Sequence, residues 1–246
     1  MKNEYIQLKN LIDSAENIVF FGGAGVSTES GLKDFRGKGG FYTEEKTGIN
    51  PAEILSHNYF LRHPEAFYEY YKNNMLFTGV EPNAAHYALA RLEKMGKLSA
   101  VVTQNVDGLH QLAGSENVYE LHGTIHYNTC MKCGRSFPVS VIENSDGVPY
   151  CDNCGGIIRP NIVLYGESLD VYTWYDAQEA IANADLLIVA GTSLVVEPAA
   201  SIVSRFRGEN LVIINKTPTP QDGKASLVIR DPVGQVLGSI IGECKE

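Results

Sequence analysis

The chain has 246 residues, of which 44% are hydrophobic, and it carries a formal net charge of −9. This length and composition can bury a substantial core, which excludes disorder as the main state and suits one large domain with or without a small appendage. The acidic balance argues against a dedicated nucleic-acid-binding protein, because such proteins gather Lys and Arg to neutralise phosphates. A basic peptide fits this charge better.

The first twenty residues predict an amphipathic helix, with Leu8, Leu11, Ile12 and Ala15 on one face. They lack the continuous apolar stretch of a signal peptide, and no later segment approaches the roughly 18 apolar residues of a membrane span. We therefore expect a cytoplasmic protein in a reducing compartment, with no membrane association, and we expect it to be a monomer.

Six short apolar runs predict the strands of a parallel sheet. Most are continuous in Val, Ile and Leu, as is typical of strands buried on both faces. Helical patterns at 84–96, 176–184 and 199–208 precede the second, fourth and fifth runs. This alternation predicts an α/β fold with a doubly wound, Rossmann-like parallel sheet. The predicted strands are 18–23, 100–105, 118–123, 186–192, 211–215 and 226–230.

Two stretches interrupt the alternation. Residues 38–80 are aromatic-rich and helical in character, and residues 125–159 contain four cysteines and turn-forming sequences. We expect 38–80 and 125–159 to form a small inserted domain, and 1–37, 81–124 and 160–246 to form the large one. The cleft between the two domains is the expected ligand site.

The cysteine spacing predicts a zinc ribbon. Cys130-x-x-Cys133 and Cys151-x-x-Cys154 are separated by seventeen residues, which falls within the spacing of zinc-ribbon ligands. Disulfides are the alternative, but nothing in the sequence indicates export, which favours zinc. Four thiolates leave no open position for water, so the predicted zinc is structural.

A glycine-rich stretch, GGAGVSTESG, follows the first predicted strand. Its glycines could bring backbone N–H groups close to a pyrophosphate at a helix start, although glycine-rich strand exits are common. Thr28 stands where a Gly-x-Gly-x-x-Gly fingerprint needs its third glycine, and no second strand ends in an acidic residue about 20 residues on. The following Asp34, Phe35 and Arg36 form either a solvated turn or a lid that shields a reacting centre.

Two further segments place polar side chains at strand ends. TQNVDGLH puts Gln104, Asn105 and Asp107 at the carboxyl edge of a strand, where α/β sheets bind ligands. An Asx-type turn is the alternative. ELHG places His122 at the end of the next strand; a lone histidine is more often structural, and this position favours a catalytic one.

In order along the chain, the motifs GAGVSTESG with DFRG, TQNVDGLH, ELHG, the two Cys-x-x-Cys pairs, RPNIVLYGE, GTSLVVEPAA and VIINK resemble those of the sirtuins, the NAD-dependent protein deacylases of the silent-information-regulator family. The resemblance covers nearly the whole chain. It implies a large NAD-binding domain, a small zinc-ribbon and helical domain, and an acetyl-lysine peptide held in the cleft between them.

The resemblance also implies roles for individual residues. His122 matches the catalytic histidine, and Asp107 matches the residue that binds the nicotinamide carboxamide. The implied NAD-binding residues are Ala24, Thr28, Phe35, Arg36, Gln104, Asn105, Val106, Asp107, Gly191, Thr192, Ser193, Asn215 and Lys216, with Asp231 near the adenine. The residues implied to pair as a strand with the substrate and to enclose the acyl-lysine are Val163, Leu164, Tyr165, Gly166 and Glu167.

The implied reaction consumes NAD: nicotinamide leaves, the acyl oxygen attacks C1′ of the ribose, and His122 acts as general base. The products are the deacetylated lysine and O-acetyl-ADP-ribose. Removal of another uncharged acyl group and mono-ADP-ribosyl transfer to a protein are the alternatives. The acidic charge disfavours a zinc-ribbon module that binds nucleic acid. The presence of His122 and Asp107 disfavours an NAD sensor without catalytic activity.

Two positions depart from the family pattern. Lys33 stands where the family usually has proline, which implies a more mobile loop. In the helical insertion, Tyr68 and Tyr71 lack the arginine that succinyl- or malonyl-selective members carry. An unpaired buried carboxylate is costly, so an uncharged acyl group is favoured.

Overall fold

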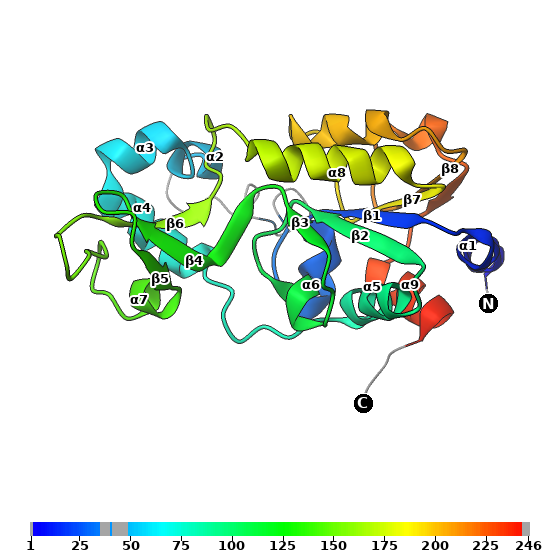
Figure 1. The fold of residues 1–246 in the computed structure, drawn as a ribbon, viewed down its shortest axis with the longest axis horizontal. Coiled ribbons are helices and arrows are strands. Elements are labelled where there is room, and N and C mark those ends of the chain that lie inside the picture. Colours follow the sequence, from blue (N-terminus) through cyan, green and yellow to red (C-terminus); the bar gives the residue numbers. More distant parts are fainter. Residues whose placement is uncertain (1, 35–39, 41–48, 243–246) are drawn as a thin grey trace.

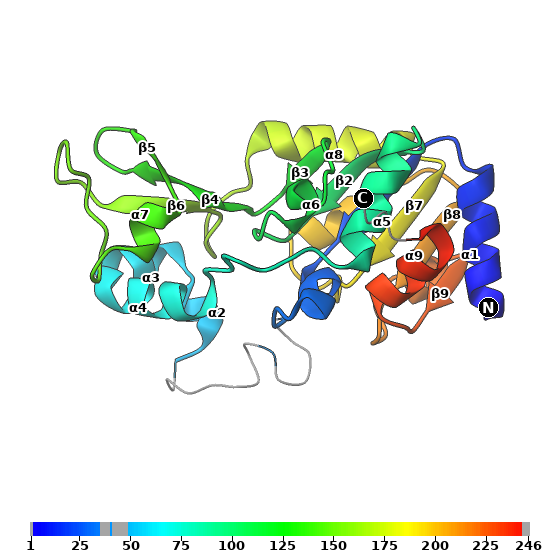
Figure 2. The same ribbon diagram turned by 90° about the horizontal axis from the view of Figure 1, so that it is seen from below.

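The computed structural model describes residues 2–34, 40 and 49–242. Two lobes lie one beyond the other along the long axis of the molecule (Figures 1 and 2). The large lobe contains a six-stranded sheet with its covering helices, and the described part of the small lobe contains a three-stranded sheet with four helices. The predicted residue boundaries of two domains stay a prediction.

The sheet of the large lobe is parallel throughout, with the strand order β3-β2-β1-β7-β8-β9. The chain builds outward from β1 to β3 and then returns to the other side of β1, so the order reverses between β1 and β7. Ligands bind at such a reversal, beyond the carboxyl ends of the strands. The predicted doubly wound α/β class is confirmed. The strands are β1 (Ile18–Gly22), β2 (Leu98–Thr103), β3 (Val118–Glu120), β7 (Leu186–Ala190), β8 (Asn210–Ile214) and β9 (Leu227–Ile229).

Helices cover both faces of this sheet. Side chains alternate between the two faces along each strand, so each face has its own set of apolar side chains to bury. Ile18 and Phe20 pack under α1 (Asn3–Ser14), α5 (Ala84–Lys94) and α9 (Val233–Ile241). Val19 and Phe21 pack under α8 (Val171–Asn183) and η2 (Ala199–Arg205). The sequence did not predict α9, and the predicted helix at 199–208 is a shorter 3-10 helix.

The small lobe has its own aromatic core. Phe60 and Phe67 meet edge to face with ring centroids 4.8 Å apart, and Tyr68 and Tyr71 pack against them with no exposed surface. The lobe combines α2 (Pro51–Ile54), α3 (His57–Arg62), α4 (Pro64–Asn74) and α7 (Ser140–Glu143) with an antiparallel sheet in the order β5-β4-β6. Its strands are β4 (Gly123–Cys130), β5 (Ser136–Pro138) and β6 (Ile158–Ile162).

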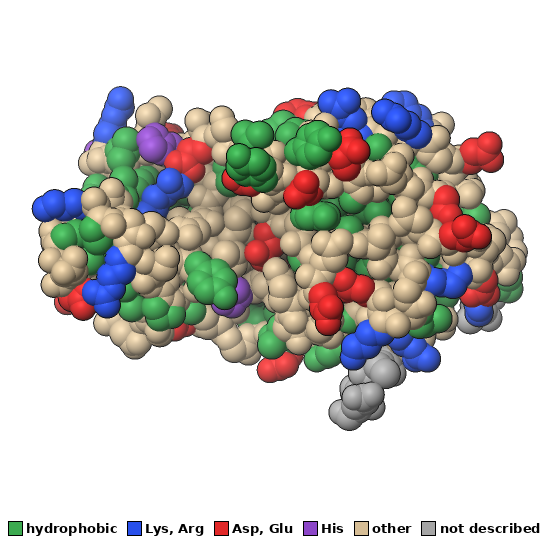
Figure 3. All heavy atoms as spheres, in the orientation of Figure 1, with side chains coloured by type: hydrophobic (Ala, Val, Ile, Leu, Met, Phe, Trp, Pro, Cys, Tyr) green, Lys and Arg blue, Asp and Glu red, His purple; other side chains and the backbone are tan. Residues whose placement is uncertain are grey.

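One cluster of exposed hydrophobic side chains lies at the start of α8. Hydrophobic side chains gather there (Figure 3), where Val171, Tyr172 and Tyr175 are 72%, 81% and 61% exposed. Elsewhere on this face, the Lys and Arg side chains of the described chain are scattered among acidic ones. Among the described residues, no helix has the length and apolar character needed to cross a membrane.

Two histidines are buried next to each other in the large lobe. His86 on α5 and His110 on α6 (Leu109–Leu112) have ring centroids 4.7 Å apart and are almost inaccessible to solvent. Burial lowers the pKa of His86 from 6.5 to about 4, and lowers that of His110 well below its usual value. As the pH falls below 6.5, the unfolded chain therefore binds protons before the folded one does. The free energy of unfolding then decreases until the pH reaches the folded pKa.

We expect His86→Gln to weaken this pH dependence. Glutamine can replace the ring nitrogen that accepts the Asn83 N–H at the helix start, and it does not titrate. Between pH 7 and pH 5 the variant should lose about 2 kcal/mol less unfolding free energy than the wild type, as urea unfolding can measure. Equal losses in the two proteins would show that His86 is not a source of acid sensitivity.

Candidate active site between the lobes

A cavity of about 720 Å³ lies between the lobes, at the carboxyl ends of the parallel strands. Its walls come from the segments that follow β1, β2, β7, β8 and β9, and from Leu55, Met75 and Phe77 of the small lobe. Phe35 and Arg36 lie outside the described residues. The other residues that the sequence analysis assigned to NAD, catalysis or substrate all line this cavity: Ala24, Thr28, Gln104, Asn105, Val106, Asp107, His122, Val163, Leu164, Tyr165, Gly166, Glu167, Gly191, Thr192, Ser193, Asn215, Lys216 and Asp231.

The exits of β1 and β7 touch through glycines. The N–H of Gly25 donates to the carbonyl of Gly191 at 2.8 Å. A Cβ on Gly25 would lie 2.7 Å from the Gly191 Cα, and a Cβ on Gly191, whose φ is +59°, would lie 2.4 Å from the Val26 nitrogen. Glycine is therefore required at both positions by this backbone contact. The sequence analysis had interpreted the glycines only as a phosphate-binding turn.

The turn after β1 is the 3-10 helix η1 (Ala24–Ser30). It is tied to the start of α9 by Glu29, whose carboxylate accepts the backbone N–H groups of Gly234 and Gln235 at 2.6 and 3.2 Å. N–H groups in the first turn of a helix have no partner within the helix, so Glu29 caps α9 with a side chain from another element. The position of η1 at the cavity is thereby fixed by a helix that the sequence analysis missed.

A buried polar network holds Asp107 at the end of β2. Ser27 donates to one carboxylate oxygen at 2.7 Å, the Leu109 N–H donates to the other at 3.0 Å, and Asn105 donates to the Ser27 hydroxyl at 3.0 Å. Burial raises the pKa of Asp107, and the hydrogen bonds from Leu109 and Ser27 oppose that rise. The bond to Leu109 is the Asx-type turn that was the alternative interpretation. Asp107 thus both forms that turn and lines the cavity.

His122 lies in the turn between β3 and β4, two residues beyond the end of the strand that was expected to end on it. Its Nδ1 is 2.9 Å from the Gln104 carbonyl oxygen. Because a carbonyl only accepts hydrogen bonds, Nδ1 carries the proton and Nε2 is left with its lone pair. Burial lowers the pKa of His122, so the ring is neutral near pH 7. A neutral imidazole with a fixed tautomer can act as a general base.

The segment after β6 is not a regular strand. β6 ends at Ile162, and Tyr165 then forms a single bridge with Ser56. The Tyr165 N–H donates to Leu55 O, and its carbonyl accepts from the His57 N–H, each at 3.0 Å. One edge of this segment is therefore already occupied by the small lobe. Its expected pairing with a substrate stays a prediction.

The four cysteines converge at the outer end of the small lobe. The Sγ atoms of Cys130, Cys133, Cys151 and Cys154 all lie within 4.8 Å of one another, and none is in a disulfide. Zn–S bonds of about 2.3 Å in a tetrahedron place sulfurs roughly 3.8 Å apart, which fits the 3.8 Å between Cys133 and Cys151. The cluster can hold one zinc ion. Its residues do not line the 720 Å³ cavity, as expected for a structural metal.

Comparison with known proteins agrees with this geometry. The family model described as the Sir2 family matches residues 23–198. The chain belongs to the Sir2 family. It is 52% identical over 237 residues to an NAD-dependent protein deacetylase of Clostridium acetobutylicum, covering 96% of this chain and 97% of that one. A protein of the same name from Staphylococcus aureus is 47% identical over 245 residues, covering 99% and 100%.

Solved Sir2 structures share the fold. One, described as Sir2 with a p53 peptide and NAD⁺, superposes with a TM-score of 0.86 at 38% identity and covers 98% of this chain and 97% of that one. A second contains a Sir2 variant with a deacetylated p53 peptide and 3′-O-acetyl ADP ribose. It has a TM-score of 0.89 at 38% identity and covers 99% and 100%.

In this Sir2-family protein, Tyr68 and Tyr71 do not reach the cavity. Both rings lie in the core of the small lobe, and the Tyr68 hydroxyl donates to the Ile158 carbonyl at 2.5 Å. The corresponding wall is apolar, formed by Leu55, Met75 and Phe77. No arginine occurs among the described residues that line the cavity. The cations among the described lining residues are Lys33 and Lys216, which belong to the large lobe and not to the apolar wall.

Asp231 differs from the other assigned residues of the Sir2-family site. Its carboxylate pairs with Lys2 at 2.7 Å and accepts from the Tyr5 hydroxyl at 3.1 Å. These contacts lower the pKa of Asp231, the hydrogen bond from Lys2 most of all. The side chain thus anchors the start of α1 at the edge of the cavity.

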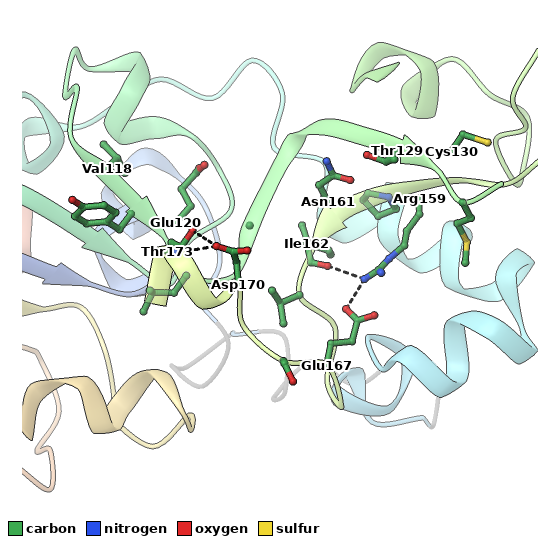
Figure 4. Close-up of a pocket in the computed structure, with 17 residues that line it drawn as sticks. Val118, Glu120, Thr129, Cys130, Arg159, Asn161, Ile162, Glu167, Asp170 and Thr173 are labelled. Atoms are coloured by element: carbon green, nitrogen blue, oxygen red, sulfur yellow. Dashed lines mark hydrogen bonds and ion pairs between the residues drawn. The ribbon is translucent and has the colours of Figure 1, made fainter. Parts of the chain in front are cut away.

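A second cavity, of about 800 Å³, lies on the opposite face of residues 162–167, which we call the wall segment (Figure 4). Val118 and Glu120 of the large lobe stand on one side of it, and Thr129 and Arg159 of the small lobe on the other. Ile162, Val163 and Glu167 line both cavities. The wall segment thus separates the two cavities. The sequence analysis did not identify this second cavity, and it gave no role to Arg159, the first residue of the RPNIVLYGE motif.

The glycine contact between the strand exits predicts a large effect of one methyl group. We expect Gly191→Ala to lower the free energy of unfolding by roughly 3 kcal/mol, because the new Cβ would overlap the Val26 backbone nitrogen. Gly223→Ala is the matched control, since nothing lies within 4 Å of a Cβ there. Denaturant unfolding of both variants measures the difference, and equal stabilities would contradict a required close approach.

The cysteine cluster predicts that zinc stabilises the small lobe. We expect Cys130→Ser to bind less than one zinc per chain and to melt at a lower temperature, because metal binding contributes folding free energy. Cys244→Ser removes a thiol outside the two Cys-x-x-Cys pairs and should change neither quantity. Stoichiometric zinc with an unchanged Tm in Cys130→Ser would argue against a structural metal.

Proposed function

We propose that this protein removes acetyl groups from lysine side chains of proteins, using NAD as co-substrate and releasing nicotinamide and O-acetyl-ADP-ribose. The observation that carries the proposal is the neutral, oriented imidazole of His122, held by Gln104 O in a cavity at the reversal point of the sheet. Relatives at about 50% identity are named NAD-dependent protein deacetylases. Related Sir2 structures contain NAD⁺, a p53 peptide or O-acetyl-ADP-ribose.

NAD is proposed to lie across the carboxyl ends of the strands. Its adenosine end would lie near Asn215 and Lys216, and its phosphates near Thr28 and the segment after β7, with Gly191, Thr192 and Ser193. The nicotinamide would occupy the pocket formed by Ala24, Gln104, Asn105, Val106 and Asp107. Phe35 and Arg36, by resemblance, would complete the cover over the ribose. The fixed carboxylate of Asp107 supports this placement, because it can accept a hydrogen bond from a carboxamide NH₂.

NAD supplies the electrophile, because departure of nicotinamide opens C1′ of the ribose to attack by the acetyl oxygen. Asp107 orients the carboxamide, so that the leaving group and the acetyl-lysine are aligned before the bond breaks. His122 Nε2 then takes the proton from a ribose hydroxyl, and the hydroxyl oxygen attacks the acetyl-derived carbon. The lysine amine leaves from this carbon with a proton, and one water molecule adds to the carbon to give O-acetyl-ADP-ribose. The bond from Nδ1 to Gln104 O stabilises the resulting imidazolium. Val106 and the apolar wall of the small lobe keep water away from C1′ while nicotinamide leaves.

The substrate is proposed to be an acetyl-lysine peptide whose side chain enters between the lobes beside Val163, Leu164, Tyr165 and Gly166. The apolar wall formed by Leu55, Met75 and Phe77 favours an uncharged acyl group. The same apolar wall makes uncharged acyl groups longer than acetyl the second candidate substrates.

We further propose a cytoplasmic monomer that binds neither nucleic acid nor membranes. The net charge of −9 supports the statement on nucleic acid. The four unoxidised thiols support a reducing compartment.

Mass spectrometry of a reaction between the purified protein, NAD and an acetyl-lysine peptide tests the function. We expect deacetylation only when NAD is present, with nicotinamide and O-acetyl-ADP-ribose formed in equal amounts. Nicotinamide release without loss of the acetyl group would instead favour ADP-ribosyl transfer or another acyl substrate. No turnover of NAD with any acyl peptide would exclude the proposed activity.

His122 is tested in the same assay. We expect His122→Ala to lower kcat by at least about a hundredfold, the scale of a lost general base, with an unchanged Tm. The exposed His63 provides the control, since His63→Ala removes an imidazole outside the cavity. As the pH is lowered, wild-type activity should begin to fall only below pH 6.5, because burial lowers the pKa of His122. A His122→Ala enzyme with full kcat would remove His122 from the mechanism.

A further inference from the structure

The wall segment is exposed to open volume on both faces. Ile162, Val163 and Glu167 line the 720 Å³ cavity on one side and the 800 Å³ cavity on the other. Ile162 and Leu164 pack into the core of the small lobe, but the other residues of the segment are not part of that core. Polar contacts fix the position of these other residues, and the contacts can be traced one by one.

Glu167 is the centre of those contacts. Its Oε2 accepts from the Leu164 N–H at 2.8 Å and from Arg159 Nη2 at 2.5 Å, and its Oε1 lies 2.6 Å from His57 Nδ1. The side chain is only 17% exposed. Burial alone would raise the pKa of Glu167, but the hydrogen bonds from Leu164, Arg159 and His57 outweigh it and lower the pKa. The carboxylate is thus ionised and already occupied within the protein.

Arg159 connects this carboxylate to the sheet of the small lobe. It lies on β6, paired with Thr129 of β4. Figure 4 shows its guanidinium reaching both the Ile162 carbonyl, at 3.0 Å, and the Glu167 carboxylate. Both bonds come from Nη2, whose two N–H donors are fixed in the guanidinium plane, whereas the donors of a lysine ammonium rotate freely on a flexible stem. Arg159 therefore fixes both ends of the wall segment relative to β6.

His57 connects the same carboxylate to the helical part of the small lobe. It is the first residue of α3, and its backbone N–H donates to the Tyr165 carbonyl at 3.0 Å. Its ring reaches Glu167 from the same side. The wall segment is thus held by the sheet through Arg159 and by the helices through His57, and Glu167 joins the two.

We propose that Arg159 and His57 are positioning residues for deacetylation: acting through Glu167, they hold the wall segment where it receives the acetyl-lysine peptide. This inference rests on the proposed function. Glu167, which the family resemblance places among the substrate-enclosing residues, serves by its side chain as an internal tie. Any contact of this residue with a peptide comes from its backbone.

The experiment compares steady-state kinetics of Arg159→Lys and Arg135→Lys. Arg135 also pairs with a carboxylate in the small lobe, Asp152, but the two side chains are 52% and 73% exposed. We expect Arg159→Lys to raise the peptide KM roughly tenfold while the NAD KM and kcat at saturating peptide stay within about twofold. Arg135→Lys should change none of these. A peptide KM unchanged in Arg159→Lys would overturn the proposal.

A purely structural role would move different quantities. If Arg159→Lys lowers the Tm and changes the NAD and peptide KM alike, the residue only stabilises the lobe, and the proposal is wrong. His57→Ala is a second variant that avoids a folding defect, because the His57 side chain is 40% exposed. It should also raise the peptide KM selectively, and an unchanged value would remove His57 from the proposal.

A double-mutant cycle tests the connection through Glu167. We expect the double variant Glu167→Gln/Arg159→Lys to raise the peptide KM by no more than the larger of the two single changes. Each substitution breaks the same contact, the one between Arg159 and Glu167, so the second has nothing further to remove. Additive effects would show that the two residues act separately. If the wild-type protein shows no NAD-dependent deacetylation, the proposed function itself is wrong. If the wild type is active but the variants keep its peptide KM, only the positioning role is wrong.

Discussion

The backbone contact between the exits of β1 and β7 is the constraint on which the site depends. Gly25 and Gly191 are hydrogen bonded and too close for a Cβ on either residue. This contact brings η1 and the segment after β7 to the same point of the sheet edge, where the strand order reverses. Glu29 then holds η1 against α9. These contacts therefore fix the backbone that bounds the cavity on this side.

His122 connects this edge of the large lobe to the wall segment. Its ring is bonded to the carbonyl of Gln104, just beyond β2, and its own carbonyl accepts the Val163 N–H at 2.9 Å. One residue thus carries the proposed base and also links the proposed nicotinamide pocket to the proposed substrate segment. Because β4 begins at the next residue, the position of the base is tied to the sheet of the small lobe as well. This arrangement explains why a histidine in a turn can be held rigidly.

The sequence predicted the large lobe well because its signals are local. Continuous Val, Ile and Leu runs identify strands buried on both faces, and all six occur within a few residues of their expected positions. The polar residues after β2 were expected at the sheet edge, since parallel strands end at one edge, and they line the cavity there. The cysteine pairs were equally informative, because two short turns of fixed spacing suffice to gather four thiols.

The sequence was less informative where contacts join distant residues. Glu167 and His57 are 110 positions apart, and no periodicity relates them. The tyrosines of the helical insertion were considered beside the acyl group, but they fill the core of the small lobe because burial of aromatic rings there dominates their placement. The glycines were interpreted through a phosphate motif, whereas their close contact is with each other. Each of these features depends on tertiary packing that local patterns do not encode.

The cysteine cluster and the wall segment lie at opposite ends of one strand pair. β4 pairs with β6 so that Cys130 faces Ile158 and Thr129 faces Arg159. A bound metal would fix the end of β4 and, through this register, the start of β6. Side chains alternate along a strand, so a shift of β6 by one residue would turn Arg159 away from Glu167. A metal remote from the reaction can therefore matter to the cleft, because it sets the register that directs Arg159 to the wall segment.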